Sequence, residues 1–135
     1  MVKMNMIYEG NLRCSVTHEP SGSVIRTDAP KDNMGRGEAF SPTDLVAAAL
    51  GCCILTIMGI VAAKHNVDLK GTTADVSKEM VTAPVRRIGK INVILHMAQG
   101  IPQEKRAMLE AAAHSCPVHK SLHPDVQMSV QFIYS

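Results

Sequence analysis

The chain has 135 residues, a net charge of +2 and 46% hydrophobic residues, a composition typical of one globular domain with a substantial core. Only 3% of the residues are aromatic, so the core is expected to be aliphatic, and the scattered basic residues exclude an obvious nucleic-acid surface. The polar N-terminal segment does not resemble a signal peptide. We therefore expect a cytoplasmic protein, in which cysteines serve catalysis or metal binding more often than structural disulfides.

The first third of the chain has the pattern of an antiparallel meander followed by a loop. Strand character is found in Met4–Tyr8, Leu12–His18 and Ser23–Thr27, and Ser21-Gly22 marks a turn. The segment Ala29–Ala39 is rich in Gly, Pro and charged residues and is expected to be a loop. Loops of this length in compact domains are often functional.

A long apolar helix is predicted next. Ser41 suits the N-cap, Pro42 the first helical position and Asp44 the acid of a capping box. The apolar pattern continues to about His65, which gives a helix of roughly 24 residues and about 36 Å.

This helix is uncharged over a length that could cross a membrane. Its many Ala, Gly, Cys and Thr residues and the missing interface Trp and Tyr instead favour a buried central helix, so no membrane contact is expected. So long an apolar helix is hard to cover with the rest of one chain. A homodimer in which two such helices pack together would cover it.

The remainder alternates between strands and short helices. Thr72–Met80 and Arg87–Met97 are predicted to form a hairpin, and Val126–Tyr134 a closing strand. Pro102–His114 is predicted to be a helix and Cys116–Leu122 a short helix; the apolar face of the first is expected to consist of Ala107, Met108, Ala111 and Ala112. No repeat, linker or low-complexity tract interrupts the chain. The sequence therefore predicts a single α+β domain over residues 1–135.

Four cysteines are the main candidates for chemistry. Cys14 lies in a predicted strand and is expected to be inert. Cys52 and Cys53 are adjacent in the long helix and point about 100° apart, and a lone helix cysteine is usually a small buried hydrophobe. Cys116 precedes Pro117 at a predicted helix N-terminus, where unpaired N–H groups favour a thiolate.

Three histidines surround this last cysteine. His114, Cys116, His119 and His123 have a spacing that could suit zinc. The simpler interpretation is a polar, partly exposed helix surface, because there is no second cysteine pair.

Two segments resemble one known family. SPTDLVAAALGCCILTIMGIVAAKHNVDL resembles the central-helix signature of the OsmC/Ohr family, the osmotically inducible and organic hydroperoxide resistance proteins, and AAAHSCPVHKSL resembles its second cysteine motif. The order of strands, Gly-rich loop, long helix, hairpin, helix and final strand is also similar. The resemblance covers nearly the whole chain and is closer to the broader OsmC-like branch than to the hydroperoxide-resistance proteins.

The resemblance implies an OsmC-like α+β fold, with antiparallel sheets around a long central apolar helix in an intertwined homodimer. It implies a thiol-dependent peroxidase that reduces organic hydroperoxides without a cofactor and is recycled by a cellular dithiol. By position, Cys53 is the peroxidatic cysteine and Cys116 the resolving cysteine. An arginine completes the site, with Arg13 the first candidate and Arg26 or Arg36 as substitutes.

One position departs from the family pattern. The hydroperoxide-resistance proteins pair this arginine with a Glu at the position held here by Thr43, and the nearby acids are Asp44 and Glu38. The change leaves two other functions open. One is a non-catalytic OsmC-like protein that binds a small apolar ligand or stabilises the dimer, and the other is a zinc-binding protein.

Overall fold

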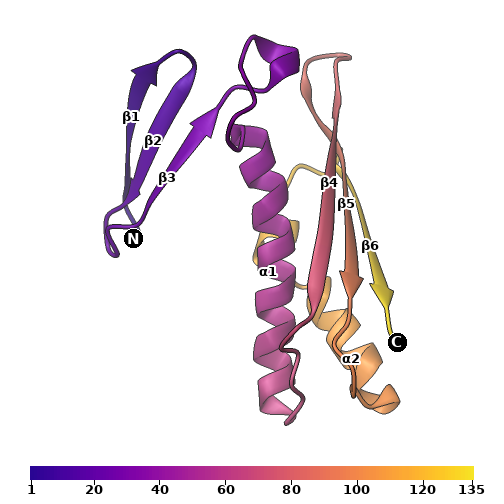
Figure 1. The fold of residues 1–135 in the computed structure, drawn as a ribbon. Helices are drawn as coiled ribbons and strands as arrows, with labels where there is room; N and C mark the ends of the chain where they lie inside the picture. The colour runs from indigo at the N-terminus through magenta and orange to yellow at the C-terminus, as the bar shows by residue number, and fades with distance from the viewer. The chain divides into compact units, whose positions relative to one another are not determined.

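The N-terminal part of the chain forms a three-stranded antiparallel meander. The computed structural model describes residues 1–135, which form two units, Met1–Val46 and Ala47–Ser135. In the first unit, β1 (Met4–Gly10), β2 (Arg13–His18) and β3 (Val24–Asp28) pair in the order β1-β2-β3 (Figure 1). The meander predicted from the sequence is confirmed, with strand ends shifted by one or two residues.

The loop after β3 turns back on the end of that strand. It contains a 3₁₀ turn, η1 (Lys31–Asn33), and its backbone returns through hydrogen bonds from Gly37 N–H to the Ala29 carbonyl and from Asp28 N–H to the Phe40 carbonyl. A Cβ at position 35 would overlap the Ala29 carbonyl, which explains why that position is Gly. The turn places the end of the loop beside the end of β3.

The second unit contains a mixed sheet, where antiparallel sheets were expected. β4 (Thr73–Val81) and β5 (Arg87–His96) form the predicted antiparallel hairpin, but β6 (Gln127–Ile133) pairs with β5 in parallel. The expectation of antiparallel sheets is therefore confirmed for the first unit and for the β4–β5 hairpin, but not for β6. The reason is the connection: a helical crossover leaves the end of β5 and returns to its start, which makes the next strand parallel.

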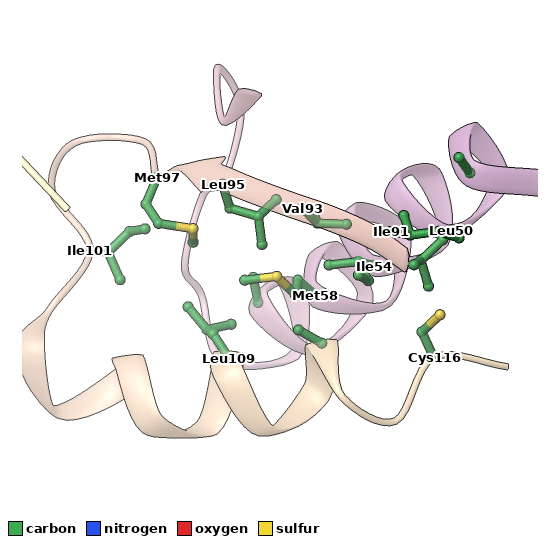
Figure 2. Close-up of a cluster of buried hydrophobic side chains, with 13 residues drawn as sticks. Leu50, Ile54, Met58, Ile91, Val93, Leu95, Met97, Ile101, Leu109 and Cys116 are labelled. Carbon is green, nitrogen blue, oxygen red and sulfur yellow. The ribbon is translucent and has the colours of Figure 1, made fainter. Parts of the chain in front are cut away.

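One face of this sheet carries the hydrophobic core. β5 alternates between buried and half-buried residues, and its buried residues pack with α1 (Pro42–Lys64) and α2 (Gln103–Ala113), as Figure 2 shows. A short helix, α3 (Pro117–Ser121), follows α2. The fully buried side chains are aliphatic, as the composition predicts; the largest are Leu50, Ile54, Met58, Ile91, Val93, Leu95 and Leu109.

The second helix does not bury all of the face expected of it. Leu109, Ala112 and Ala113 are buried, whereas Ala107 and Ala111, which were expected on the apolar face, are exposed. The spacing of Leu109 and Ala113 by one turn sets the buried stripe.

α1 begins at Pro42 and ends at Lys64, close to the predicted bounds. It is the one helix in the chain that is long and apolar enough to cross a membrane, with a mean hydropathy of 2.5, and 33% of its most apolar window is buried within the chain. The buried residues recur every three or four positions, at Ala47, Leu50, Gly51, Ile54, Met58 and Ala62. This stripe makes α1 a core helix of the second unit, while the residues outside the stripe are half-buried or, like Ile60, exposed.

Two glycines in α1 test how closely this helix approaches the sheet. A Cβ at Gly51 would lie 2.8 Å from Val76 Cγ2, whereas a Cβ at Gly59 would meet nothing within 4 Å. We expect Gly51→Ala to lower the free energy of unfolding by about 1–3 kcal/mol, because the stiff Val76 must move. Gly59→Ala should raise it by about 0.5–1 kcal/mol through helix propensity. Urea denaturation of both variants measures the difference, and equal effects would contradict the close approach.

Candidate functional site

The second unit brings the two predicted redox cysteines together. Cys53 is half-buried on α1 and packs against the core, and Cys116 is fully buried within that core. Both are free thiols, and they lie close to each other. In Figure 2 Cys116 lies at the Leu50 end of the cluster, away from Met97 and Ile101. A thiol on a helix and a thiol on the following crossover therefore meet in an apolar environment.

Cys116 occupies the N-cap of α3, as predicted. Its Sγ accepts a hydrogen bond from His119 N–H at 3.2 Å, and Pro117 is the first helical residue. The protonation of this thiol, however, is opposite to the expected one. Burial is the main reason that the pKa of Cys116 is raised, and the neighbouring Cys53 raises it further, while the His119 N–H only partly offsets them. The raised pKa favours the protonated thiol of Cys116.

The neighbouring histidines do not form a metal site. No group of three or more His, Cys, Asp or Glu side chains in the chain has an arrangement that could hold a metal ion. The rings of His114 and His119 are edge to face with centroids 6.3 Å apart, and His123 is exposed beside Asp125. Burial, followed by repulsion from His114, lowers the pKa of His119. The geometry does not support the zinc alternative.

α2, which leads into Cys116, is held against β6 by the C-terminal tyrosine. Tyr134 donates a hydrogen bond to Glu110 Oε2 at 3.0 Å, and the Arg106 guanidinium lies 4.1 Å from the centroid of its ring. Burial and the Glu110 carboxylate raise the pKa of Tyr134 to about 12, so the hydroxyl remains a donor. This contact fixes the helix that precedes the buried thiol.

The first unit contains a charge cluster around Arg13. The Arg13 guanidinium lies 2.9 Å from Glu38 Oε2 and 3.4 Å from Asp28 Oδ2. The hydrogen bond with Glu38 and the charge of Asp28 raise the pKa of Arg13. Glu38, one of the two expected acids, is therefore beside the preferred arginine.

Asp28 is the member of this cluster that sequence reasoning missed. It is only 1% exposed, and its Oδ2 accepts hydrogen bonds from Glu38 N–H at 3.0 Å and from Arg13. The hydrogen bond from the Glu38 N–H, aided by the charge of Arg13, lowers the pKa of Asp28 against the effect of burial. Asp28 is the partner of Arg13 in the β2–β3 register, which depends on a turn centred between Pro20 and Ser21; the turn expected at Ser21-Gly22 would have placed Pro30 opposite Arg13.

The remaining candidate acid and arginines have other positions. Asp44 accepts a hydrogen bond from Ser41 N–H at 2.9 Å while its own N–H bonds Ser41 Oγ at 3.0 Å, which is the predicted capping box. Arg36 is 4.0 Å from Glu38 and 80% exposed. Arg26 lines a pocket of about 320 Å³ together with Arg13 and the acids of the cluster. Of the three arginines, Arg13 thus makes the closest ion pairs.

The other two cysteines take no part in these clusters. Cys14 is half-buried in β2, between Tyr8 of β1 and Thr27 of β3. Cys52 is exposed on α1 beside Cys53, as the turn of the helix requires.

Comparison with known proteins identifies the family of the chain. The sequence profile described as OsmC-like protein matches residues 35–131. A solved structure from Psychrobacter arcticus 273-4, described as a proposed osmotic stress induced and detoxification response protein, is 42% identical, with a TM-score of 0.92 over 98% of this chain and 96% of that one. The chain belongs to the OsmC-like family.

More distant OsmC-like structures share the fold. The organic hydroperoxide resistance protein OsmC of Legionella pneumophila is 18% identical, with a TM-score of 0.78 over 98% of this chain and 96% of that one. The organic hydroperoxide resistance protein OhrB of Bacillus subtilis is 17% identical, with a TM-score of 0.72 over 98% of both chains. No curated protein matches the sequence significantly.

The protonation of the buried thiol is directly measurable. In a variant with Cys14, Cys52 and Cys53 replaced by Ser, the thiolate absorbance of Cys116 near 240 nm should rise with a midpoint above the ordinary thiol pKa of about 8.5. The pKa of Cys116 is thus higher in the folded than in the unfolded chain. The thiol therefore contributes its full stabilisation at pH values below the unfolded pKa, and this contribution is lost as the pH rises through the folded pKa. Unfolding in urea should return the midpoint to the ordinary value. A native midpoint below that value would show that the N-cap outweighs burial.

Proposed function

We propose that this OsmC-like protein is a thiol-dependent peroxidase that reduces organic hydroperoxides through Cys53 and Cys116. The observation that carries the proposal is the neighbouring pair of free thiols, with Cys53 half-buried and Cys116 fully buried. Two structures with the same fold are named organic hydroperoxide resistance proteins, which supports this reaction class.

In the first step Cys53 acts as the nucleophile. Its thiolate attacks the distal oxygen of the hydroperoxide, the O–O bond breaks, and the products are Cys53 sulfenic acid and an alkoxide. The alkoxide needs a proton to leave as an alcohol. In this proposal Cys116 supplies that proton, because burial favours its protonated form and it lies beside Cys53.

In the second step Cys116 attacks the sulfenic sulfur. A disulfide forms between the two cysteines, and the sulfenic oxygen leaves as water after taking up a proton. The His119 N–H stabilises the Cys116 thiolate during this step, since it already donates to Sγ. A cellular dithiol then reduces the disulfide and is itself oxidised.

The charge for the first step comes, in this proposal, from Arg13. A thiolate in an apolar environment is disfavoured unless a cation stabilises it, and a guanidinium can also polarise a peroxide. Arg13 is held by Asp28 and Glu38 in a defined position, whereas Arg36 is largely exposed. This difference supports Arg13 as the arginine of the site.

The environment of the thiols favours apolar substrates. Cys116 belongs to the same buried aliphatic cluster as Leu50 and Ile54, and Cys53 packs against that cluster. Bulky organic hydroperoxides bury apolar area in such a site, so they should react faster than hydrogen peroxide.

Stopped-flow oxidation with cumene hydroperoxide tests the assignment. Cys53→Ser should slow thiol oxidation by more than about a hundredfold, because the thiolate is the nucleophile. Cys116→Ser should still form the sulfenic acid, which dimedone traps, but no intrachain disulfide. The matched controls, Cys14→Ser and Cys52→Ser, should react as the parent does. If Cys53→Ser reacts as fast as the parent, the chain is not this peroxidase, and a non-catalytic ligand-binding role is favoured.

We also propose that the chain works as a homodimer. Met4, Met6 and Tyr8 share one face of β1 and are 52%, 61% and 64% exposed, and Ile60 on α1 is 49% exposed. Exposed apolar surface of this kind marks an interaction site, and a second copy would cover both elements. Sedimentation velocity at micromolar concentration should give twice the chain mass, with Met6→Lys shifted toward the monomer. A monomeric parent would exclude this proposal.

A further inference from the structure

The chain lacks the acid that is expected to hold the arginine of its family, because position 43 is Thr. An arginine on a flexible four-bond stem loses considerable rotamer entropy when it is fixed. Some other group must therefore position Arg13 if it is to act at a defined point. The structure offers two carboxylates, Asp28 and Glu38.

The position of Asp28 is fixed by contacts other than the one with Arg13. It lies directly opposite Arg13 in the β2–β3 register, so both side chains leave the same face of the sheet. The Glu38 N–H donates to its Oδ2 at 3.0 Å, and the side chain is only 1% exposed. The carboxylate is thus anchored by two strands and by the returning loop.

The second oxygen of Asp28 supports a role toward the guanidinium. Oδ1 is buried and has no hydrogen-bond partner, which is costly for a carboxylate oxygen. A guanidinium can donate to both oxygens of one carboxylate. Arg13 now donates only to Oδ2, at 3.4 Å, so the unused oxygen allows the pair to tighten into a two-bond contact.

The other acids are less suited to this task. Glu38 is closer to Arg13, but its side chain is 56% exposed and also lies 4.0 Å from Arg36. An exposed ion pair between long side chains is screened by water and salt and does little to fix geometry. Asp44 is engaged in the helix cap with Ser41.

We infer that Asp28 is the positioning residue for Arg13 and takes the role that Thr43 cannot fill. Its importance for the reaction rests on the proposed peroxidase function. Asp28 acts through Arg13 and does not itself touch the substrate. Asn at position 28 would keep the shape and could still accept the Glu38 N–H, but it would lose the charge that holds the guanidinium.

The first experiment does not depend on activity. A carbon-detected NMR titration of the Asp28 carboxyl in the parent and in Arg13→Met measures the coupling between the two groups. We expect the Asp28 pKa to be higher in Arg13→Met, since a nearby cation is lost. An unchanged Asp28 pKa would overturn the inference, and this measurement remains valid if an Asp28 variant does not fold.

The second experiment is a double-variant cycle on the rate of Cys53 oxidation by cumene hydroperoxide. Arg13→Met and Asp28→Asn should each slow it by roughly ten- to a hundredfold, as misplacement of a reacting group does. The combined variant should be no slower than Arg13→Met alone, because Asp28 acts only through Arg13. Glu19→Gln, at an exposed acid just after β2 and outside this pocket, is the matched control and should stay within about twofold.

The outcomes separate the two proposals. A parent that is not oxidised by the peroxide refutes the proposed function, while the NMR titration still decides the coupling of Asp28 and Arg13. If the parent reacts but Asp28→Asn slows Arg13→Met by the same factor as it slows the parent, Asp28 has only a structural role and the inference is wrong. Urea midpoints of all variants show that the rates belong to folded protein.

Discussion

The stripe of Leu50, Ile54 and Met58 on α1 packs against β5, and the thiol pair exists only because of this contact. Because Gly51 has no side chain, α1 can lie close to Val76 of β4. α2 and the crossover must then close over the same apolar cluster, and this places Cys116 inside it. A helix that packed one residue out of register would turn Cys53 away by about 100°.

Burial and hydrogen bonding have opposite effects at the second thiol. An N-cap donor favours the thiolate, but the surrounding aliphatic side chains favour the neutral form, and the latter effect is larger for Cys116. Two chemically identical thiols therefore have different tasks in the proposed mechanism. A protonated, buried Cys116 is suited to donate a proton and to attack later, which leaves the nucleophilic role to the more accessible Cys53. The same apolar packing that stabilises the fold thereby orders the proposed steps.

The charge cluster of the first unit solves a different problem. A guanidinium that acts at one defined position needs a carboxylate whose own position is fixed. Hydrogen bonds to the backbone fix a carboxylate better than a short distance to the guanidinium does. Asp28 has this anchoring through the sheet register and the Glu38 N–H, whereas the Glu38 side chain is nearer to the arginine but exposed. In our proposal Asp28 therefore takes the part that the family pattern gives to an acid at position 43. Loss of an acid at position 43 need not mean loss of the network.

Local patterns in the sequence were sufficient to predict the helices and strands, the capping box at Ser41 and the family. Each of these depends on neighbouring residues or on two short motifs. Contacts between distant residues were not readable in the same way. The parallel pairing of β6, the buried state of Cys116 and the orphaned oxygen of Asp28 each depend on what packs from elsewhere in the chain. Sequence determined the candidate groups and the family; only the tertiary structure decided that burial raises the pKa of Cys116 and that Asp28 and Glu38 lie beside Arg13, because desolvation and ion pairing are properties of the packed interior.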